Sequence, residues 1–310
     1  MYGGTERVMW DLGNSLTKLG HKVTFLVNEA SHCAFADVII YKPNQDINAQ
    51  IPESVDLVHC HTIPPQTLKK PYMITIHGNP SFGELLDKNC VFVSKNHAQR
   101  YQSNAFVHNG LDWENYPQPK LNQPKSYFHF LANAAWKVKN VRGAIAITKK
   151  TKERLMVLGG YRLNLKMGLR LTLDTHVDFK GMVNNEEKAK LMQNSKGLIF
   201  AVLWHEPFGL AVIESLYFGC PVFATPYGSL PELVNKDLGF LTASADEMTN
   251  ALKNAHQYDK LKCHQHALNN FSSSIMAKNY LTYYERVLNG EKLNPTSPTL
   301  KQKPEKYLPF

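Results

Sequence analysis

Short apolar runs alternate with stretches of helical periodicity along the chain, and this alternation is typical of a parallel sheet wrapped by helices. The runs of strand length form two series separated by a polar break. The strand-like runs are residues 23–27, 38–40, 57–58, 72–76 and 91–93, followed by 127–131, 155–158, 177–179, 198–202 and 221–224. Two such series predict an α/β protein with two doubly wound, Rossmann-like domains.

The break between the two series is residues 116–125, which contain three prolines among mainly polar residues. This composition favours an exposed linker, so we place the domain boundary near residue 123. The first domain then covers 1–123 and the second covers 124–290. Residues 291–310 contain four prolines and four lysines with little apolar periodicity, which predicts a disordered tail.

The chain of 310 residues is 43% hydrophobic and 20% charged, as expected for globular domains with their own cores. No apolar run approaches the length of about 18 residues that a membrane-spanning helix needs, and no leader segment is expected at the start. The five cysteines are scattered without a C-x-x-C pair. This spacing predicts free thiols in a reducing compartment, hence a cytoplasmic protein.

The net charge of +9 belongs to the C-terminal half of the chain, and its densest part is residues 137–170, with ten basic residues and one acidic residue. Three interpretations compete: a solvated helix face, a patch for nucleic acid or anionic membrane, and a diphosphate pocket. No recognised nucleic-acid motif accompanies the charge, so we expect no nucleic-acid partner.

Two glutamates, Glu206 and Glu214, lie eight residues apart around an expected junction between a loop and a helix. Pro207 can take the first helical position, Gly209 lets a ligand approach the backbone, and residues 210–218 form an apolar helical run. Glu214 then lies about two turns into the helix, where its carboxylate can accept hydrogen bonds from vicinal ribose hydroxyls. The alternative is an ordinary capped helix with a solvated glutamate.

The block from Gly197 to Glu232 closely resembles the donor-binding core of the retaining GT-B-fold glycosyltransferases of family 4, the glycosyl transferases group 1. The likeness rests on the E-x7-E pair, a G-x-P-V strand start at Gly219 and a G-S-L-P-E loop from Gly228. Weaker matches are residues 3–6, 75–78 and 108–112. The resemblance implies two Rossmann-like domains facing a cleft, with helix 275–288 crossing back to the first domain.

The resemblance also implies roles for individual residues. Glu206 would bind the donor sugar together with the amides of Phe208, Gly209 and Leu210, and Glu214 would hold the ribose. In the first domain, His77 would approach the transferring centre, and Gly3 and Gly4 would admit the donor phosphates. Met182 and Val183 would pack on the nucleobase, although a turn before a helix explains that loop equally well.

The chain contains no Asp-x-Asp pair, so a bound metal is not expected and basic side chains would neutralise the diphosphate. The resembled family has a G-R…E-K-G segment here, and its arginine is absent from this sequence. Lys139 best matches the family lysine. Lys137 and Arg142 are candidate substitutes for the arginine, and which cation meets which phosphate stays open.

Two further patterns need an interpretation. His59 and His61 share one face of an expected strand, but no carboxylate or further histidine is near in sequence, so polar residues at a strand end are preferred to a metal site. The chain also begins at Met1 directly before the glycine pair, where the resembled family has a strand. We therefore expect either an upstream start or an impaired first domain.

The sequence thus predicts a retaining hexosyltransferase that uses a nucleotide diphosphate sugar and no cofactor. The acceptor would be a hydroxyl of a saccharide, a lipid-linked molecule or a small molecule, and peripheral contact with the inner face of a membrane would suit a lipid-linked one. Two alternatives stay open: a catalytically impaired protein that binds sugar nucleotides, and a GT-B-fold sugar-nucleotide epimerase. A phosphorylase is disfavoured, because no lysine signature for pyridoxal is present.

Overall fold

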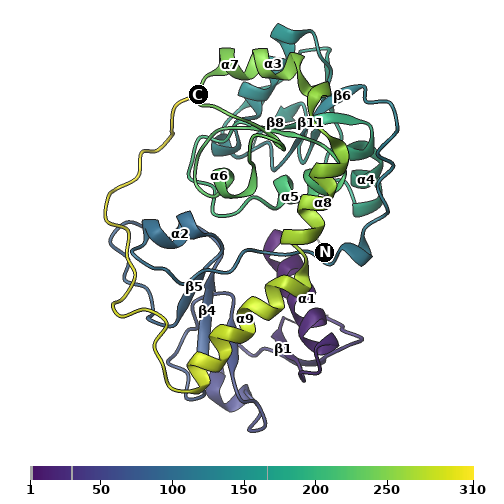
Figure 1. Ribbon diagram of the computed structural model, residues 1–310. Coiled ribbons are helices and arrows are strands. Elements are labelled where there is room, and N and C mark those ends of the chain that lie inside the picture. The colour runs from purple at the N-terminus through teal and green to yellow at the C-terminus, as the bar shows by residue number, and fades with distance from the viewer. Residues whose placement is uncertain (1–2, 29–30, 166) are drawn as a thin grey trace. The chain divides into compact units, whose positions relative to one another are not determined.

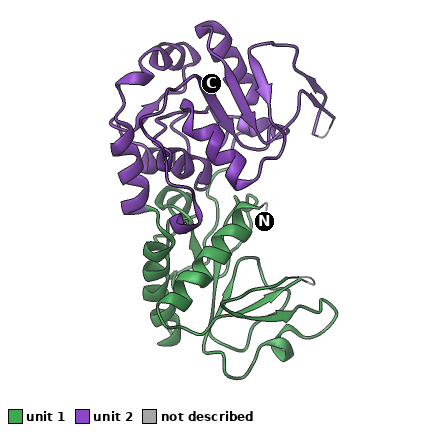
Figure 2. Ribbon diagram, turned by 90° about the vertical axis from the view of Figure 1, so that its right-hand side faces the viewer, with its two compact units in different colours: residues 1–112, 271–303 green, residues 113–270, 304–310 purple. Residues whose placement is uncertain are grey.

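The computed structural model of the chain describes residues 3–28, 31–165 and 167–310 (Figure 1). The predicted features at Met1, Tyr2 and Lys166 therefore lie outside the described residues. The chain divides into two compact units, coloured separately in Figure 2. Unit 1 comprises residues 1–112 and 271–303, and unit 2 comprises residues 113–270 and 304–310.

Unit 1 contains two small parallel sheets instead of one. Its helices and strands are α1 (Gly4–Lys18), β1 (Thr24–Val27), β2 (Asp37–Ile40), β3 (Val58–Cys60), β4 (Tyr72–Ile76), β5 (Cys90–Phe92), α2 (Lys95–Arg100) and α9 (Ser273–Leu288). β1 pairs with β2, and β3, β4 and β5 pair in that order. Among the described residues no strand joins β1 to β3, so the sheet is split where a doubly wound order would place its first strand.

Helix α1 packs against strand β1 and against helix α9. Val8 and Leu12 are buried at the helical spacing read from the sequence. Trp10 packs with its ring parallel to that of Phe25 on β1, at 6.3 Å between ring centroids. On its other side α1 contacts α9, where the Ser15 hydroxyl donates to the Ser273 hydroxyl at 2.8 Å.

Unit 2 contains one six-stranded parallel sheet with the order β10-β7-β6-β11-β12-β13. Its strands are β6 (Tyr127–Leu131), β7 (Leu155–Leu158), β10 (Val177–Phe179), β11 (Ser195–Phe200), β12 (Val222–Ala224) and β13 (Gly239–Leu241). Its helices are α3 (Val141–Thr151), α4 (Asn185–Gln193), α5 (Leu210–Tyr217), α6 (Leu230–Leu233), α7 (Ala245–Lys253) and α8 (Lys260–Asn270). This is the strand order 3-2-1-4-5-6 of a dinucleotide-type doubly wound sheet.

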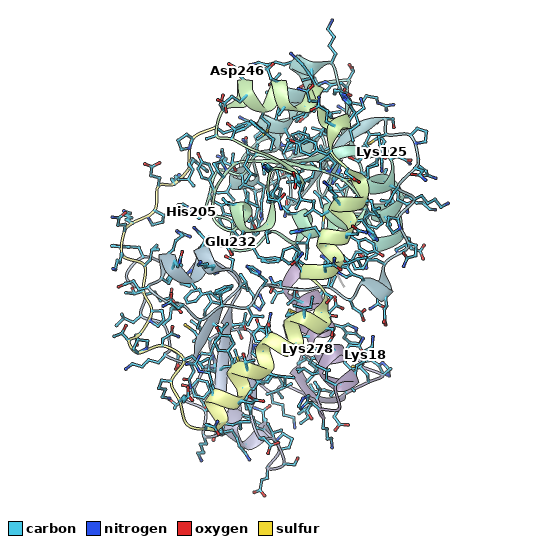
Figure 3. All side chains as sticks on the ribbon, viewed as in Figure 1. Lys18, Lys125, His205, Glu232, Asp246 and Lys278 are labelled. Atoms are coloured by element: carbon cyan, nitrogen blue, oxygen red, sulfur yellow. The ribbon has the colours of Figure 1, made fainter. Side chains whose placement is uncertain are left out.

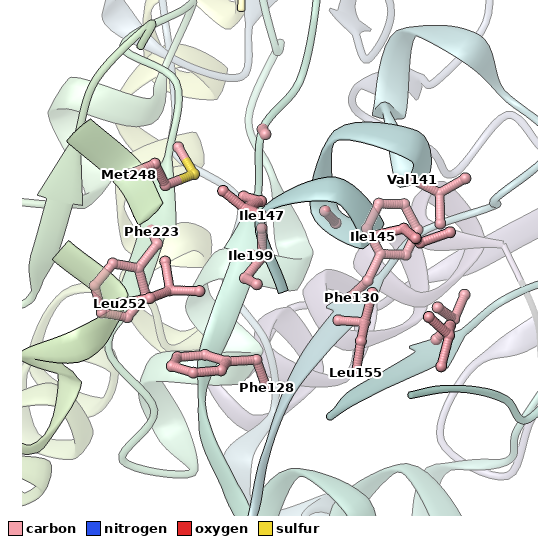
Figure 4. Packing of buried hydrophobic residues seen from close by; sticks show 14 of the residues in the cluster. Phe128, Phe130, Val141, Ile145, Ile147, Leu155, Ile199, Phe223, Met248 and Leu252 are labelled. Atoms are coloured by element: carbon pink, nitrogen blue, oxygen red, sulfur yellow. The ribbon is translucent and has the colours of Figure 1, made fainter. Parts of the chain in front are cut away.

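The core of unit 2 lies between this sheet and the helices α3 and α7. Phe128 and Phe223 meet edge to face at 5.8 Å between ring centroids, and Ile147 and Leu252 pack against the same cluster (Figure 4). Phe128 and Phe223 belong to nearly continuous apolar runs on β6 and β12, because a parallel sheet is covered on both faces.

Two boundaries differ from those expected. The division falls after Asp112 because Trp113 stacks on Tyr217 at 4.5 Å between ring centroids, which makes the proline-rich segment part of unit 2.

The predicted disordered tail over 291–310 is also corrected. Asn294 is buried and donates to the Cys90 carbonyl at 2.8 Å, and Phe310 packs against the core of unit 2.

Candidate functional site

The strand order of unit 2 reverses between the neighbouring strands β6 and β11. The chain runs from β6 through α3 to β7 on one side, and from β11 through α5 to β12 on the other. Ligands of open α/β sheets bind at such a switch point, beyond the carboxyl ends of the strands. The loops that leave these two ends are residues 132–140 and 201–209, and they carry the predicted Lys139 and Glu206.

The structure brings Lys139 and Glu206 into direct contact. Lys139 Nζ lies 2.7 Å from Glu206 Oε2, and Trp204 Nε1 donates to the same oxygen at 2.8 Å. The ammonium also lies 4.9 Å from the centroid of the Trp204 ring. Glu206 is only 7% exposed, so these contacts compensate a carboxylate that has lost most of its water.

Asn140 holds the two loops together. Its backbone has a positive φ of 56°, and its side-chain oxygen accepts from the Gly143 amide at 3.0 Å, which caps α3. Its side-chain nitrogen donates to the Ala201 carbonyl at 2.9 Å. Nearby, the Leu203 amide donates to the Val138 carbonyl at 2.8 Å. The position of Glu206 therefore depends on the start of α3.

Helix α5 begins later than the sequence suggested. Gly209 caps it with a φ of 100°, which favours glycine, and the first helical residue is Leu210. Pro207 therefore precedes the cap and does not take the first helical position. Phe208 is buried, the Val212 amide donates to the Gly209 carbonyl at 2.9 Å, and the N-terminal end of α5 carries partial positive charge. An anionic group is favoured at this end.

Glu214 is buried, so the alternative of a solvated glutamate is wrong. It is 3% exposed, and its Oε1 accepts from the Tyr116 hydroxyl at 2.8 Å and from Lys188 Nζ. Lys188, on α4, is 6% exposed and also lies over the ring of Tyr116, 5.7 Å from its centroid. The helix that follows the predicted nucleobase loop is thus joined to the second glutamate of the pair.

The other predicted residues of unit 2 differ in their surroundings. Lys137 and Arg142 are exposed near the start of α3, and the structure does not pair them with Glu206. Met182 is half exposed, whereas Val183 packs against a small buried cluster under α4. These two residues follow Gly181, whose φ of 67° turns the chain from β10 toward α4.

Gly3, Gly4 and His77 belong to unit 1. Gly3 is the extended cap of α1 and Gly4 is its first residue, with no side chain capping the helix. His77 follows β4, as a residue at a strand end. Burial lowers the pKa of His77 to about 4, so its imidazole is neutral near pH 7.

His77 has a neighbour that sequence distance concealed. His61 follows β3, the strand beside β4, and its Nδ1 lies 2.9 Å from Nε2 of His77. The rings of His59 and His61 stack at 4.2 Å, so these two residues do share a face. His59 Nδ1 in turn bonds the Tyr284 hydroxyl at 2.7 Å. No group of three or more His, Cys, Asp or Glu side chains in the part of the chain that the structure describes is arranged to hold a metal ion.

Four contributors to the site escaped the sequence reasoning: Trp204, Asn140, Lys188 and Tyr116. Trp204 and Asn140 adjoin residues that were singled out, so their closeness in sequence was a usable signal. Lys188 resembled a solvated charge on a polar helix, and Tyr116 lay in the presumed linker. Only the fold brings the last two to Glu214.

The comparison with known families concerns mainly the part of the chain that carries this site. Residues 112–264 match the glycosyl transferases group 1. This segment contains both glutamates of the pair, Lys139, and the loop of Met182 and Val183. The match supports a glycosyltransferase.

Solved glycosyltransferase structures share the fold of nearly the whole chain. AviGT4, a glycosyltransferase involved in avilamycin A biosynthesis, is 20% identical, with a TM-score of 0.75 over 94% of this chain and 91% of that one. HepE from Anabaena in complex with UDP-glucose is 16% identical, with a TM-score of 0.67 over 94% and 97%. Sucrose-phosphate synthase from Thermosynechococcus elongatus is 15% identical, with a TM-score of 0.70 over 93% and 94%. The chain therefore has the α/β fold of the GT-B glycosyltransferases.

A curated relative from Klebsiella pneumoniae, an uncharacterized 41.2 kDa protein in the cps region, is 26% identical over 117 residues. The match covers 36% of this chain and 32% of that protein, about a third of its length. None of the helices formed by the described residues has the length and apolar character needed to cross a membrane.

Proposed function

We propose that this chain is a retaining glycosyltransferase that moves a hexose from a nucleotide diphosphate sugar to a hydroxyl acceptor without a metal ion. The observation that carries the proposal is the ion pair of Lys139 and Glu206 at the switch point of the unit 2 sheet. It joins a carboxylate suited to sugar hydroxyls with a cation suited to a phosphate, in the place where the fold binds ligands.

Glu206 is assigned to the transferred sugar. The bonds from Lys139 and Trp204 both end on Oε2, which leaves Oε1 to accept from a sugar hydroxyl. The amides of Phe208, Gly209 and Leu210 at the start of α5 add donors to the same region. Glu214 is assigned to the ribose, for which Lys188 and Tyr116 hold its carboxylate in place.

In the transfer, the bond between the anomeric carbon and the diphosphate oxygen breaks while the acceptor oxygen bonds to that carbon from the same face. The acceptor proton passes to the departing phosphate oxygen, and the nucleoside diphosphate leaves. Lys139, aided by Lys137 and Arg142, would stabilise the charge that develops on the leaving group. His77, neutral and hydrogen-bonded to His61, is proposed to act at the transferring centre.

The nature of the donor is supported by solved relatives. HepE was crystallised with UDP-glucose, and starch synthase IV from Arabidopsis thaliana was bound to ADP and acarbose. We therefore propose a nucleoside diphosphate hexose as co-substrate and no separate cofactor. Metal independence is part of the same proposal, because lysines and helix ends supply the positive charge.

The test is a transfer assay with radiolabelled UDP-, GDP-, ADP- and dTDP-hexoses against saccharide and lipid-linked acceptors. The matched variants are Glu206→Gln and Glu247→Gln, the second of which changes an exposed glutamate of α7 in the same unit, outside the block from Gly197 to Glu232. Figure 3 labels Asp246, the residue before Glu247, together with His205, the residue before Glu206. Transfer that is lost in Glu206→Gln and kept in Glu247→Gln supports the proposal. Equal transfer by both variants would remove Glu206 from the mechanism.

A second candidate is a protein that binds sugar nucleotides without turnover, and the split sheet of unit 1 favours it. The residues proposed above for the transferred sugar, the ribose and the leaving diphosphate belong to unit 2, so their arrangement does not depend on the sheets of unit 1. Calorimetry with nucleoside diphosphates, combined with the transfer assay, separates the two candidates, since a binding protein takes up nucleotide but transfers no sugar to any acceptor. We further propose a cytoplasmic location, in keeping with the five unpaired thiols.

A further inference from the structure

A hairpin in unit 2 exposes its apolar side chains to solvent. Its strands are β8 (Leu163–Asn164) and β9 (Arg170–Leu171), which pair antiparallel, and it extends from the body of unit 2 at the right of Figure 2. Alternate residues from 161 to 173 are apolar, and each is at least 52% exposed: Tyr161, Leu163, Leu165, Met167, Leu169, Leu171 and Leu173. We call this set the leucine face.

The opposite side of the hairpin is polar and turned inward. Arg170 is only 8% exposed and donates to the Thr172 hydroxyl at 2.7 Å and to the Tyr161 carbonyl at 2.9 Å. Its guanidinium lies 5.0 Å from the centroid of the Phe179 ring. Arg162 lies over the same ring and donates to the Asp174 carbonyl at 3.0 Å. The arginines thus fix the hairpin with its leucines outward, the reverse of the usual polarity of a surface hairpin.

A contiguous apolar patch of this kind marks an interaction surface. The charges around it indicate the occupant. Exposed Lys137 lies beside Gly168 at the turn of the hairpin. The neighbouring acids Asp174 and Asp178 are paired, each at 2.8 Å, with Lys149 and Arg154. An apolar projection with an exposed lysine at its turn, beside acids that are already paired, matches an anionic bilayer, into which apolar side chains insert while a lysine meets the headgroups.

We propose that the leucine face inserts into the interfacial region of an anionic lipid bilayer. Two-residue strands offer few backbone groups for pairing with another protein, so side-chain insertion is the contact that the hairpin suits best. The hairpin also adjoins the donor site, because the Tyr161 ring packs against Gly181, the residue before Met182. On the proposed function, membrane contact here would bring the donor site to a lipid-linked acceptor.

The experiment is co-sedimentation of the full chain with phosphatidylcholine vesicles that contain or lack phosphatidylserine. The variant is Leu165→Ser with Leu169→Ser, both outside the paired strands. The matched control is Leu261→Ser, a 50% exposed leucine on α8 of the same unit. We expect binding to the anionic vesicles, a loss of at least tenfold in the hairpin variant, and no change in the control.

Three outcomes would overturn the proposal: no binding of the parent chain to anionic vesicles, equal binding by the hairpin variant, or equal loss in the control. Light scattering without vesicles measures the oligomeric state of the chain. A dimer that is lost in the hairpin variant would assign the leucine face to a second copy of the chain and overturn the proposal. Melting curves verify that each variant is folded. Calorimetry with UDP tests the donor site separately, so that failure of membrane binding and failure of the proposed function are distinguishable.

Discussion

Replacing Lys188 by methionine tests whether the buried network around Glu214 is structural. The substitution keeps the length of the side chain and removes its charge, so Glu214, 3% exposed, keeps the Tyr116 hydroxyl as a donor but loses its ion-pair partner. Removing one partner of a buried ion pair costs about 3–5 kcal/mol, because the remaining charge is desolvated and uncompensated. For a domain of this size each kcal/mol lowers Tm by about 2–4 °C, so we expect a decrease of roughly 6–20 °C.

Calorimetric melting measures this change, and Lys190→Met is its matched control. Lys190 lies on the same helix but is exposed, so its loss should change stability by less than about 0.5 kcal/mol. The double variant Lys188→Met with Glu214→Gln should regain much of the stability, since it removes both charges. If Lys188→Met melts within about 2 °C of the parent, or if the two substitutions add without coupling, the reasoning from burial is refuted.

Three further results are expected. Glu214→Ala should weaken binding of the free nucleoside diphosphate by about 10- to 150-fold in calorimetry, because a charged hydrogen bond worth roughly 1.5–3 kcal/mol is lost; unchanged affinity would remove the ribose assignment. Sugar transfer should survive excess EDTA and fall further in Lys139→Ala than on chelation, whereas activity abolished by EDTA and restored by Mg²⁺ would contradict the mechanism. Burial lowers the pKa of His77 to about 4 and that of His59 to about 3, so their neutral forms add stability above about pH 6.5. That stability should be lost on acidification, by about 1.4 kcal/mol per pH unit for each histidine as pH falls toward the folded pKa, and melting temperatures that do not decrease between about pH 7 and about pH 5 would argue against it.

The strands of both units could be predicted closely from sequence, because buried parallel strands are short apolar runs with polar flanks. Residues 127–131, 155–158 and 177–179 coincide with β6, β7 and β10. β13, Gly239–Leu241, was missed because it begins with a glycine, a residue depleted in strands. The domain boundary was misplaced for a different reason: prolines indicate an irregular segment, but they do not reveal on which unit that segment packs.

The parts of the candidate site that depend on residues close together in sequence could be predicted. The E-x7-E spacing predicted a loop followed by a helix, which the structure has, but Lys139, Tyr116 and Lys188 contact the two carboxylates from positions distant in sequence. Lys188 and Lys190 look alike on a polar helix, and only the packing of α4 buries the first. The hairpin carried a visible signal, since alternate leucines from Leu163 to Leu173 have the period of a strand. Arg162 and Arg170 in the same segment suggested a charged surface instead. Both arginines turn inward because they pack on the ring of Phe179, a contact that the sequence does not reveal.

The split between the sheets of unit 1 determines how that unit would unfold locally. In the described segments no ladder of hydrogen bonds joins β1 to β3, so the unfolding of the two sheets is coupled only through helices. Trp10 links β1 to α1, and Ser15 links α1 to α9. Helix α9 is linked in turn to β4 by a hydrogen bond of 3.0 Å between the hydroxyls of Tyr280 and Thr75. The strands β1 and β2 thus form a separate opening unit, whose amides should exchange with deuterium well before those of β4. In unit 1, β1 and β2 would unfold locally while the segments that carry His59, His61 and His77 stay folded.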